Sequence, residues 1–487
     1  MATTSGAAPD GSPDGTTQQL GEASPHIGRT VLVAGTAALG GFLFGFDTAV
    51  INGAVKAVGE QFHANPFLLG LAVAIALIGA AIGAWNAGAL ADRYGRIRVM
   101  LIAALFFFVS AFGSGFAFTI YDLAFWRLIG GMGVGAASVI APAYIAEISP
   151  ARLRGRLGSL QQMAIVSGIF VALLVDYALV SASGTPANPG GSATDPLWFG
   201  VTTWRWMFIS LAVPALIYGV LSLTIPESPR YLVAKNDQAK AGEVLRRFVG
   251  GDVKAKIAEI AQSLVGKSDK PSMSVLRRSG GGLLPIVWVG ILLSVFQQFT
   301  GINVVFYYST VLWQSVGFTE NDALLTGVIT SVTNILTTLI AIALVDRVGR
   351  KPLLLVGAAG QFVCLLVLAF IFGTAPVVNG VPHLGGAGPV AVVAFNLFVV
   401  FFGCSWGPVV WVMLGEMFNN KIRAMALAVA AAAQWIANFI ISVTFPPLSA
   451  ISLGLAYGIY TLFALLAVVF VVKFVRETKG KELEEMV

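Results

Sequence analysis

Twelve long apolar segments constrain the fold of this chain more than any other feature. Each approaches the roughly 20 residues that a helix needs to cross a bilayer. The segments are continuous rather than alternating, which disfavours a β-barrel. Only 11% of the 487 residues are charged, against roughly 25% in a soluble domain. The predicted spans lie near 31–53, 67–90, 98–117, 121–146, 157–180, 204–224, 283–310, 323–345, 352–374, 390–417, 422–445 and 452–474.

Basic residues predict how the spans are oriented. If the N-terminus lies inside, all but three of the 30 Lys and Arg residues fall on the cytoplasmic side. The exceptions are Lys56 and Arg205, which lie outside, and Arg127, which lies within a span. Both termini are therefore predicted to be cytoplasmic. The basic residues behind the net charge of +6 lie in loops on one membrane face, so this charge does not indicate a nucleic-acid partner.

Three pairs of motifs repeat about 250–270 residues apart. "DRYGR" (92–96) and "DRVGR" (346–350) follow the second and eighth spans. "EISPARLR" (147–154) and "EMFNNKIR" (416–423) follow the fourth and tenth, and "PESPR" (226–230) and "RETKG" (476–480) follow the sixth and twelfth. This register predicts a duplicated six-span unit, whose halves face each other across a central cavity as in transporters.

The repeats and the composition together predict the domain organisation. Residues 226–280 form the long polar segment between the halves, and two of its stretches are typical of short amphipathic helices outside the membrane. The predicted divisions are a disordered tail at 1–27, a bundle at 28–225, the helical linker at 226–280, a bundle at 281–475 and a tail at 476–487.

Amide and indole side chains interrupt several predicted spans. An amide offers both donors and acceptors, as a sugar hydroxyl requires, and it loses water more cheaply than a carboxylate does. An indole adds an apolar face and an N–H donor. Hydrogen bonds between helices are the alternative role for any one of these residues. The set predicts a site for a neutral polyol and comprises Gln162, Gln297, Gln298, Asn303, Asn334, Trp411, Gln434 and Trp435.

Asp47 places a carboxylate inside the apolar stretch "GGFLFGFDTAVING". A charge at mid-membrane depth costs roughly 2.5–3.5 kcal/mol and usually faces a cavity or a partner. Arg127, in "FWRLIGGMGVG", is the one cation within a span. We interpret Asp47 as the lone intramembrane acid and predict that it pairs with Arg127 and exchanges a proton. A purely structural pair is the alternative.

Two segments are predicted to act in gating. In "GINVVFYYST", Tyr307 and Tyr308 are expected to swing across the outer mouth, although ordinary aromatic packing is the alternative. In "GPVVW", Gly407 and Pro408 predict a bend beside Trp411, because proline removes a backbone donor.

The charged residues of the repeated motifs are predicted to form a cytoplasmic latch. Ion pairs that tie the halves together exist in one conformation and break in the other. Solvated anchors of the topology are the alternative. The predicted latch residues are Asp92, Arg93, Arg96, Glu147, Arg154, Arg156, Glu227, Arg230, Asp346, Arg347, Arg350, Glu416, Arg423 and Glu477.

Four phrases, "GRLGSLQQMAIVSGI", "QQFTGIN", "GPVVWVMLGEMF" and "PESPR", resemble the sugar porter family of the major facilitator superfamily. The resemblance covers about residues 28–480, with Arg476 at a position where the family has proline. It implies a major facilitator fold with twelve transmembrane helices in two six-helix bundles. It also implies that an aspartate at position 47 accompanies proton coupling in bacterial relatives. The sugar contacts that it implies are Gln162, Gln297, Gln298, Asn303, Trp411 and Gln434.

These observations predict uptake of a monosaccharide, a hexose rather than a pentose, across the cytoplasmic membrane by alternating access with proton symport. Facilitated uniport stays open, because Leu211 stands where some proton-coupled relatives carry a second carboxylate. A sugar sensor is disfavoured by the short tails, and a drug–proton antiporter by the amide-rich spans. The expected partners are a sugar, a proton and the lipid bilayer, with the chain acting as a monomer.

An enzymatic function is disfavoured. The sequence offers no nucleophile–base pair, metal cluster or phosphate-binding loop, so no cofactor or metal is expected. Cys364 and Cys404 fall inside apolar segments and are interpreted as packing residues.

Overall fold

The computed structural model describes residues 27–150, 153–186, 188–265, 273–278, 281–378, 381–418 and 422–478. Within them, twelve helical segments are long and apolar enough to cross a membrane, which confirms the predicted all-helical class. Helices of the first half are α1 (Ile27–Ala49), α2 (Ile51–Gln61), α3 (Pro66–Tyr94), α4 (Arg96–Gly115), α5 (Ile120–Ile148), α6 (Arg154–Ala182), α7 (Thr203–Ser210) and α8 (Ala212–Ser222).

The second half follows the same plan. Its helices are α12 (Pro285–Phe299), α13 (Ile302–Ser315), α14 (Glu320–Val348), α15 (Arg350–Thr374), α16 (Gly388–Phe401), α17 (Gly407–Met417), α18 (Arg423–Ile451) and α19 (Leu453–Phe474). A π-helical turn, η7 (Phe402–Trp406), joins α16 to α17. A two-residue hairpin of β1 (Val377–Val378) and β2 (Val381–Pro382) lies before α16.

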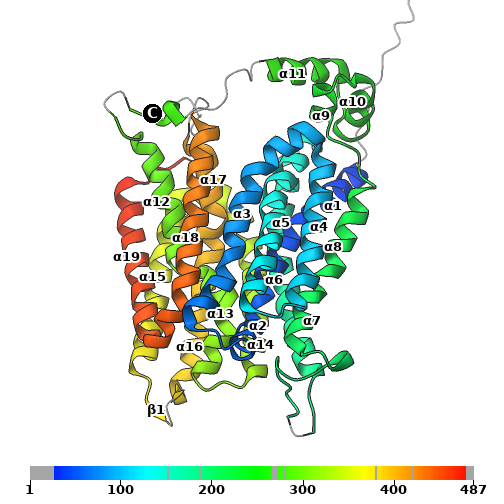
Figure 1. Ribbon diagram of the computed structural model, residues 1–487. Coiled ribbons are helices and arrows are strands. Elements are labelled where there is room, and N and C mark those ends of the chain that lie inside the picture. Colours follow the sequence, from blue (N-terminus) through cyan, green and yellow to red (C-terminus); the bar gives the residue numbers. More distant parts are fainter. Residues whose placement is uncertain are drawn as a thin grey trace, which may run out of the picture.

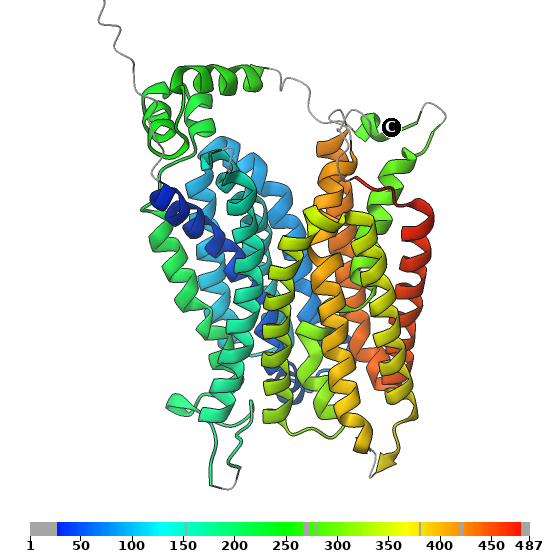
Figure 2. The ribbon, with the colours of Figure 1, turned by 180° about the vertical axis from the view of Figure 1, so that it is seen from behind.

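The two halves stand side by side (Figures 1 and 2). They meet where α3 packs on α18 and where α6 packs on α14. Both ends of the described chain lie at the same end of the molecule as the linker helices (Figure 1). We call the opposite end, where α2 and α13 end and α7 begins, the far end.

The linker contains more helix than its sequence predicts. Two amphipathic stretches were expected, and they correspond to α10 (Gln238–Val244) with its π-helical continuation η3 (Leu245–Val249) and to α11 (Val253–Val265). A further short helix, α9 (Pro229–Ala234), precedes them. Ser228 caps it by accepting from the backbone N–H groups of Arg230 and Tyr231, which begins a helix where the sequence shows only a motif.

Several spans extend beyond their predicted limits because polar residues at their ends remain helical. The second span begins at Pro66 behind the cap Asn65, whose side chain accepts from the N–H of Leu68. It continues through the charged residues to Tyr94, beyond the predicted end at 90. Hydropathy therefore predicts which part of a helix lies in lipid, whereas capping residues determine where the helix begins and ends.

Glycines bring α3 and α5 into backbone contact. A Cβ at Gly131 would lie 2.0 Å from the carbonyl oxygen of Ala76, and one at Gly135 would lie 1.9 Å from that of Ala80. Glycines on α3 are equally close to α5, since a Cβ at Gly83 would lie 2.1 Å from the Met132 carbonyl oxygen. Lipid provides no hydrophobic driving force between helices, so the close van der Waals packing that small residues allow stabilises such interfaces instead.

Candidate functional site

A break in the seventh span gathers three of the predicted amides. Gly301 separates α12 from α13 with φ of +85°, a left-handed conformation that favours glycine. Gln298 donates to the Gln297 Oε1 atom at 3.2 Å, and Asn303 Nδ2 donates to Gln298 Oε1. The break therefore aligns the side chains on either side of it in one chain of hydrogen bonds.

A second break faces the first. A π-helical turn interrupts the tenth span directly before Gly407 and Pro408. Gln297 Nε2 donates to the Trp406 carbonyl oxygen at 2.8 Å and to that of Gly407 at 3.2 Å. Gln297 and Gln298 are only 3% and 4% exposed. Two interrupted helices thus hold a buried amide cluster between them.

The remaining predicted contacts lie on other helices. Gln162 of α6 and Asn303 of α13 are half-buried. Gln434 of α18 is half-buried too, and its Oε1 has no hydrogen-bond partner among the described residues. An acceptor left free in this way is available to a donor from a ligand.

Aromatic residues of the second half differ in their surroundings. Trp435 is half-buried and lies 6.0 Å from Phe44 of the first half, measured between ring centroids. Trp411 is 44% exposed. Trp406, which the sequence does not single out, is fully buried and donates through Nε1 to the Leu354 carbonyl oxygen at 2.9 Å. Asn334 is buried on α14, and its own carbonyl oxygen accepts from Thr338.

Gln161 is a buried amide that the sequence interpretation missed. It lies against α1, where a Cβ at Gly41 would come within 2.7 Å of its Nε2 atom. Both polar atoms of its side chain lack a partner in the described part of the chain. The predicted residue is its neighbour Gln162, which stays a prediction. Adjacent helical residues point about 100° apart, so the two amides have different surroundings.

The structure brings Asp47 and Arg127 together. Arg127 Nη1 lies 3.2 Å from Asp47 Oδ1 and donates to the Asp47 carbonyl oxygen at 2.8 Å. Both side chains are 2% exposed. Gly130 provides the room, because a Cβ there would lie 2.5 Å from Ser110 and 3.2 Å from Asp47. Within the described residues, Asp47 Oδ2 and Arg127 Nε have no hydrogen-bond partner, so the pair is incomplete.

Asp47 is not the lone acid of the spans, and that interpretation was wrong. Asp176 lies in α6 and is completely buried. Its Oδ2 accepts from the Gly53 N–H at 3.2 Å. The signal was present, since the predicted span 157–180 includes this position.

Hydrogen bonds join the two halves at the far end. Asn52 of α2 donates to Ser309 Oγ at 2.8 Å, and its Oδ1 accepts from the Thr310 N–H at 3.0 Å. Glu320, at the start of α14, accepts from the Ser192 hydroxyl at 2.9 Å and the Ala193 N–H at 2.8 Å. We call these contacts the far-end lock.

The tyrosines predicted to gate lie beside this lock. Tyr307 and Tyr308 are both buried. Tyr308 donates to the Ser442 carbonyl oxygen of α18 at 2.8 Å, a contact inside the second half. In the conformation described here, both rings are therefore packed and do not line an open mouth.

Charged motifs at the linker end form one cluster in each half. Arg96 binds Glu147 through two hydrogen bonds of 3.1 and 3.0 Å, and Glu227 accepts from the Arg96 N–H at 2.9 Å. Arg350 binds Glu416 in the same way at 3.0 and 2.7 Å, and Glu477 accepts from the Arg350 N–H at 3.0 Å. The duplication seen in the sequence is thus repeated atom for atom.

These clusters connect helices of one half rather than the two halves. A tight turn at Gly95 (φ +98°) or Gly349 (φ +105°) directs the following arginine onto the end of the fourth or tenth span. The contacts described for Arg96 and Arg350 lie within one half. The tie between the halves was expected for the conformation that is shut inside, and it stays a prediction. The side chains of Arg154, Arg156 and Asp346 lie outside the described residues.

The other predicted latch residues lie around these clusters. Asp92 pairs with Arg96 at 3.2 Å, and Arg423 donates to the Phe418 carbonyl oxygen at 3.2 Å. Arg93 and Arg347 are exposed, whereas Arg230 is half-buried.

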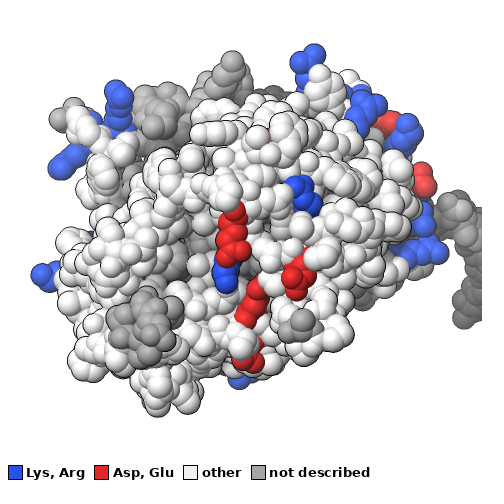
Figure 3. Space-filling view, turned by 60° about the horizontal axis from the view of Figure 1, so that its bottom comes forward, with Lys and Arg blue, Asp and Glu red and all other residues white. Residues whose placement is uncertain are grey.

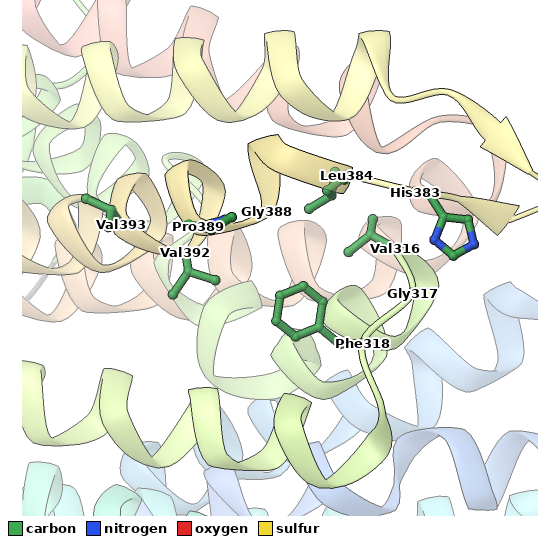
Figure 4. Close-up of a pocket in the computed structure, with 10 residues that line it drawn as sticks. Val316, Gly317, Phe318, His383, Leu384, Gly388, Pro389, Val392 and Val393 are labelled. Carbon is green, nitrogen blue, oxygen red and sulfur yellow. The ribbon is translucent and has the colours of Figure 1, made fainter.

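Two surface hollows lie at the far end, away from the amide cluster. One, of about 570 Å³, is apolar, and Phe318, Val392 and His383 contribute to its lining (Figure 4). The second, also about 570 Å³, is polar and includes Lys56, Glu320 and Asp322. Acidic side chains gather near the centre of this face (Figure 3). None of the residues predicted to bind sugar lines either hollow.

Twelve spans in two matching halves, with paired helix breaks and a buried amide cluster, define a membrane transporter of the major facilitator fold. The family model for "Sugar (and other) transporter" matches residues 33–487. The chain belongs to this sugar transporter family, and its relatives are transporters rather than enzymes.

Similar proteins support this assignment along the whole chain. A "Glucose transport protein" of Synechocystis sp. is 58% identical over 96% of this chain and 98% of its own length. A "D-xylose-proton symporter" of Escherichia coli is 39% identical over 95% of each chain. Among solved structures, the inward-open xylose transporter XylE from Escherichia coli has a TM-score of 0.78 at 37% identity, covering 93% of this chain and 98% of that one.

Proposed function

We propose that this protein takes up a hexose across the cell membrane by alternating access, together with a proton. The observation that supports the proposal most is the pairing of two sites in one molecule. A buried amide cluster lies at the helix breaks of the second half, and an incomplete acid–base pair lies in the first half. A hexose is favoured because the most similar of the relatives described above is named a glucose transport protein.

The amide cluster would bind the sugar. Gln297 and Gln298 now share their hydrogen bonds with each other and with backbone carbonyls, so sugar hydroxyls can replace these partners without leaving polar groups unsatisfied. Gln162, Gln434 and the two tryptophans of α17 and α18 would complete the contacts from both halves. Asn334 is assigned a supporting role on α14.

Asp47 would carry the proton. Its Oδ2 lacks a partner in the described chain, and its single cation, Arg127, also binds the Asp47 backbone. When water reaches the pair from one side, the carboxyl can accept or release a proton while Arg127 keeps its backbone contact. The names of two relatives, both xylose–proton symporters, agree with this role.

The far-end lock and the linker-end clusters would act as the two gates. In the proposed orientation the linker and both termini are cytoplasmic, so the described conformation is closed outside. This agrees with its similarity to an inward-open structure. In the inward-closed state, the linker-end charges would connect the two halves. The protein is proposed to function as a monomer in the bilayer.

A facilitative uniporter is the second candidate. The buried position of the Asp47–Arg127 pair is compatible with a purely structural role, and Leu211 is a buried apolar residue where a second carboxylate would stand.

Accumulation of labelled glucose in cells, with and without a protonophore, separates the two candidates. Symport predicts accumulation against a gradient that the protonophore abolishes. Asp47→Asn is expected to lose accumulation and keep sugar exchange across proteoliposome membranes. A parent protein that only equilibrates glucose would refute proton coupling and leave uniport.

A further inference from the structure

Asp176 is a buried acid for which sugar binding and the Asp47 pair provide no role. Its side chain has no exposed surface. One oxygen accepts from the Gly53 N–H at 3.2 Å, and the other, Oδ1, has no partner among the residues that the structure describes. The contact is close, because a Cβ at Gly53 would lie 2.8 Å from Asp176 Oδ2.

This carboxyl lies directly beneath the far-end lock. Gly53, which it binds, follows Asn52, the residue whose amide joins α2 to Ser309 and Thr310 of α13. Separation of the two halves at this end would move α2 relative to α13. Because Asp176 accepts from a backbone N–H of α2, such a movement of α2 would change the surroundings of its carboxyl group. The lock and the acid are thus mechanically connected through two consecutive residues.

No cation among the described residues neutralises Asp176. On α1 and α5, Asp47 and Arg127 bind each other, and Asp122 lies in the first turn of α5 at the far end. On α7, Arg205 donates to the carbonyl oxygens of Gly115 and Ala117.

The charged groups on the other two neighbouring helices lie at the ends of the molecule. On α2, Lys56 and Glu60 are exposed. On α14, Glu320 and Asp322 lie at the far-end surface, and Arg347 lies at the opposite end. An ionised carboxylate buried without a cation is costly, so the neutral acid is the form that fits the closed far end.

We propose that Asp176 is a proton-operated element of the far-end gate. The closed gate holds the protonated carboxyl in a dry environment. When the halves separate at this end, water reaches the carboxyl and it releases its proton. Closing reverses the step, and one proton from the medium at the far end forms the O–H bond.

This role differs from that of Asp47 in its proton balance. A proton taken up by Asp176 on closing returns to the same side on opening, so it contributes nothing to net transport. Asp176 instead makes opening of the gate sensitive to the pH at the far end. The inference rests on the proposed function only for the assignment of that end to the outside.

Spin labels across the far end would measure the gate directly. Lys56→Cys on α2 and Asp322→Cys on α14 are exposed positions that line the polar hollow. They are introduced after replacing the native thiols by Cys364→Ser and Cys404→Ser. The distance distribution in nanodiscs, followed from pH 5 to pH 9, gives the ratio of open to closed gates.

The parent should open as pH rises, by up to about tenfold in the ratio per pH unit, because one proton is released on opening. Asp176→Asn keeps an acceptor for the Gly53 N–H and removes the titration, so its ratio should not change with pH. Glu60→Gln, a surface acid on α2, is the matched control and should behave as the parent.

Two results would overturn the proposal. One is a parent ratio that does not depend on pH, and the other is an unchanged pH dependence in Asp176→Asn. If Asp47→Asn removes the dependence while Asp176→Asn retains it, the titration belongs to Asp47.

Should Asp176→Asn fail to fold, the infrared band of the protonated carboxyl in the parent must weaken on opening, and a constant band refutes the proposal. Failure of proton-coupled accumulation would leave this test unaffected.

Discussion

The two halves of the molecule share a scaffold and differ in their interiors. At the linker end, Arg96 with Glu147 matches Arg350 with Glu416 in both geometry and partners. Inside the membrane the first half buries an ion pair, whereas the second half breaks its first span at a left-handed glycine and gathers three amides there. Duplication has therefore retained the contacts that connect helices within each half, while the interiors have diverged into a charged one and an uncharged one.

The largest expected effect comes from breaking the charge pair of the first half. Arg127→Met leaves Asp47 buried without a cation, and loss of one partner of a buried pair costs about 3–5 kcal/mol. Thermal unfolding in detergent would show the loss. Arg127→Met combined with Asp47→Asn should recover most of the stability, and a single variant as stable as the parent would contradict a charged pair.

The next largest effect should come from the amide cluster of the second half. Gln297→Ala removes two donor contacts and is expected to weaken glucose binding about 10- to 100-fold, or about 1.4–2.8 kcal/mol. The two carbonyl oxygens that lose their donor should also lower the stability by about 1–3 kcal/mol. Binding can be measured by scintillation proximity. Gln314→Ala, at the far end of α13, is the control, and equal affinities for both variants would remove Gln297 from the site.

A third comparison concerns the first span of each half. Val50, between α1 and α2, keeps right-handed helical angles, whereas Gly301, between α12 and α13, has φ of +85°. Gly301→Ala should therefore cost about 1–2 kcal/mol for the left-handed backbone, and more if Tyr460 cannot move, since the new Cβ would lie 2.7 Å from its ring. Thermal unfolding measures the loss. A Gly301→Ala variant as stable as the parent would contradict this account of the break.

The smallest expected effect is a difference in stability between variants of the two linker-end clusters. The side chain of Glu147 is 15% exposed and that of Glu416 is 32% exposed. Glu147→Gln should cost about 1–2 kcal/mol, and Glu416→Gln about 1 kcal/mol or less, because water weakens the more exposed pair. Urea or heat titration of both variants tests the order. A larger loss of stability in Glu416→Gln than in Glu147→Gln would contradict this order and show that exposure to water does not decide the strength of the two ion pairs.

Much of the fold follows from sequence, because apolar length and repeated motifs are direct consequences of the bilayer and of duplication. The ends of helices do not follow, since a helix continues into water wherever caps and charged residues allow it, as at Tyr94. The additional linker helix, α9, begins because the Ser228 side chain caps its first N–H groups. The sequence motif alone does not reveal this cap.

The site is only partly predictable for a different reason. Residue type and spacing place Gln297, Gln298 and Asn303 on one span, but only the left-handed Gly301 brings them into one hydrogen-bonded chain. Direction within a helix also decides what an amide touches, which is why Gln161 was missed beside Gln162. The motif charges were expected to bridge the halves when the inside is shut, and that stays a prediction. What the sequence does not show is that the turns at Gly95 and Gly349 direct their arginines onto a glutamate of the same half.

The glycine contacts between α3 and α5 determine which surfaces can move. With backbone against backbone, neither helix can slide or rotate without a steric clash, so the two behave as a single rigid lever. Rocking must then be confined to the seams between the halves, where α3 meets α18, α6 meets α14 and α2 meets α13. A crosslink across any of these seams would arrest the transport cycle, while one between α3 and α5 would leave turnover intact.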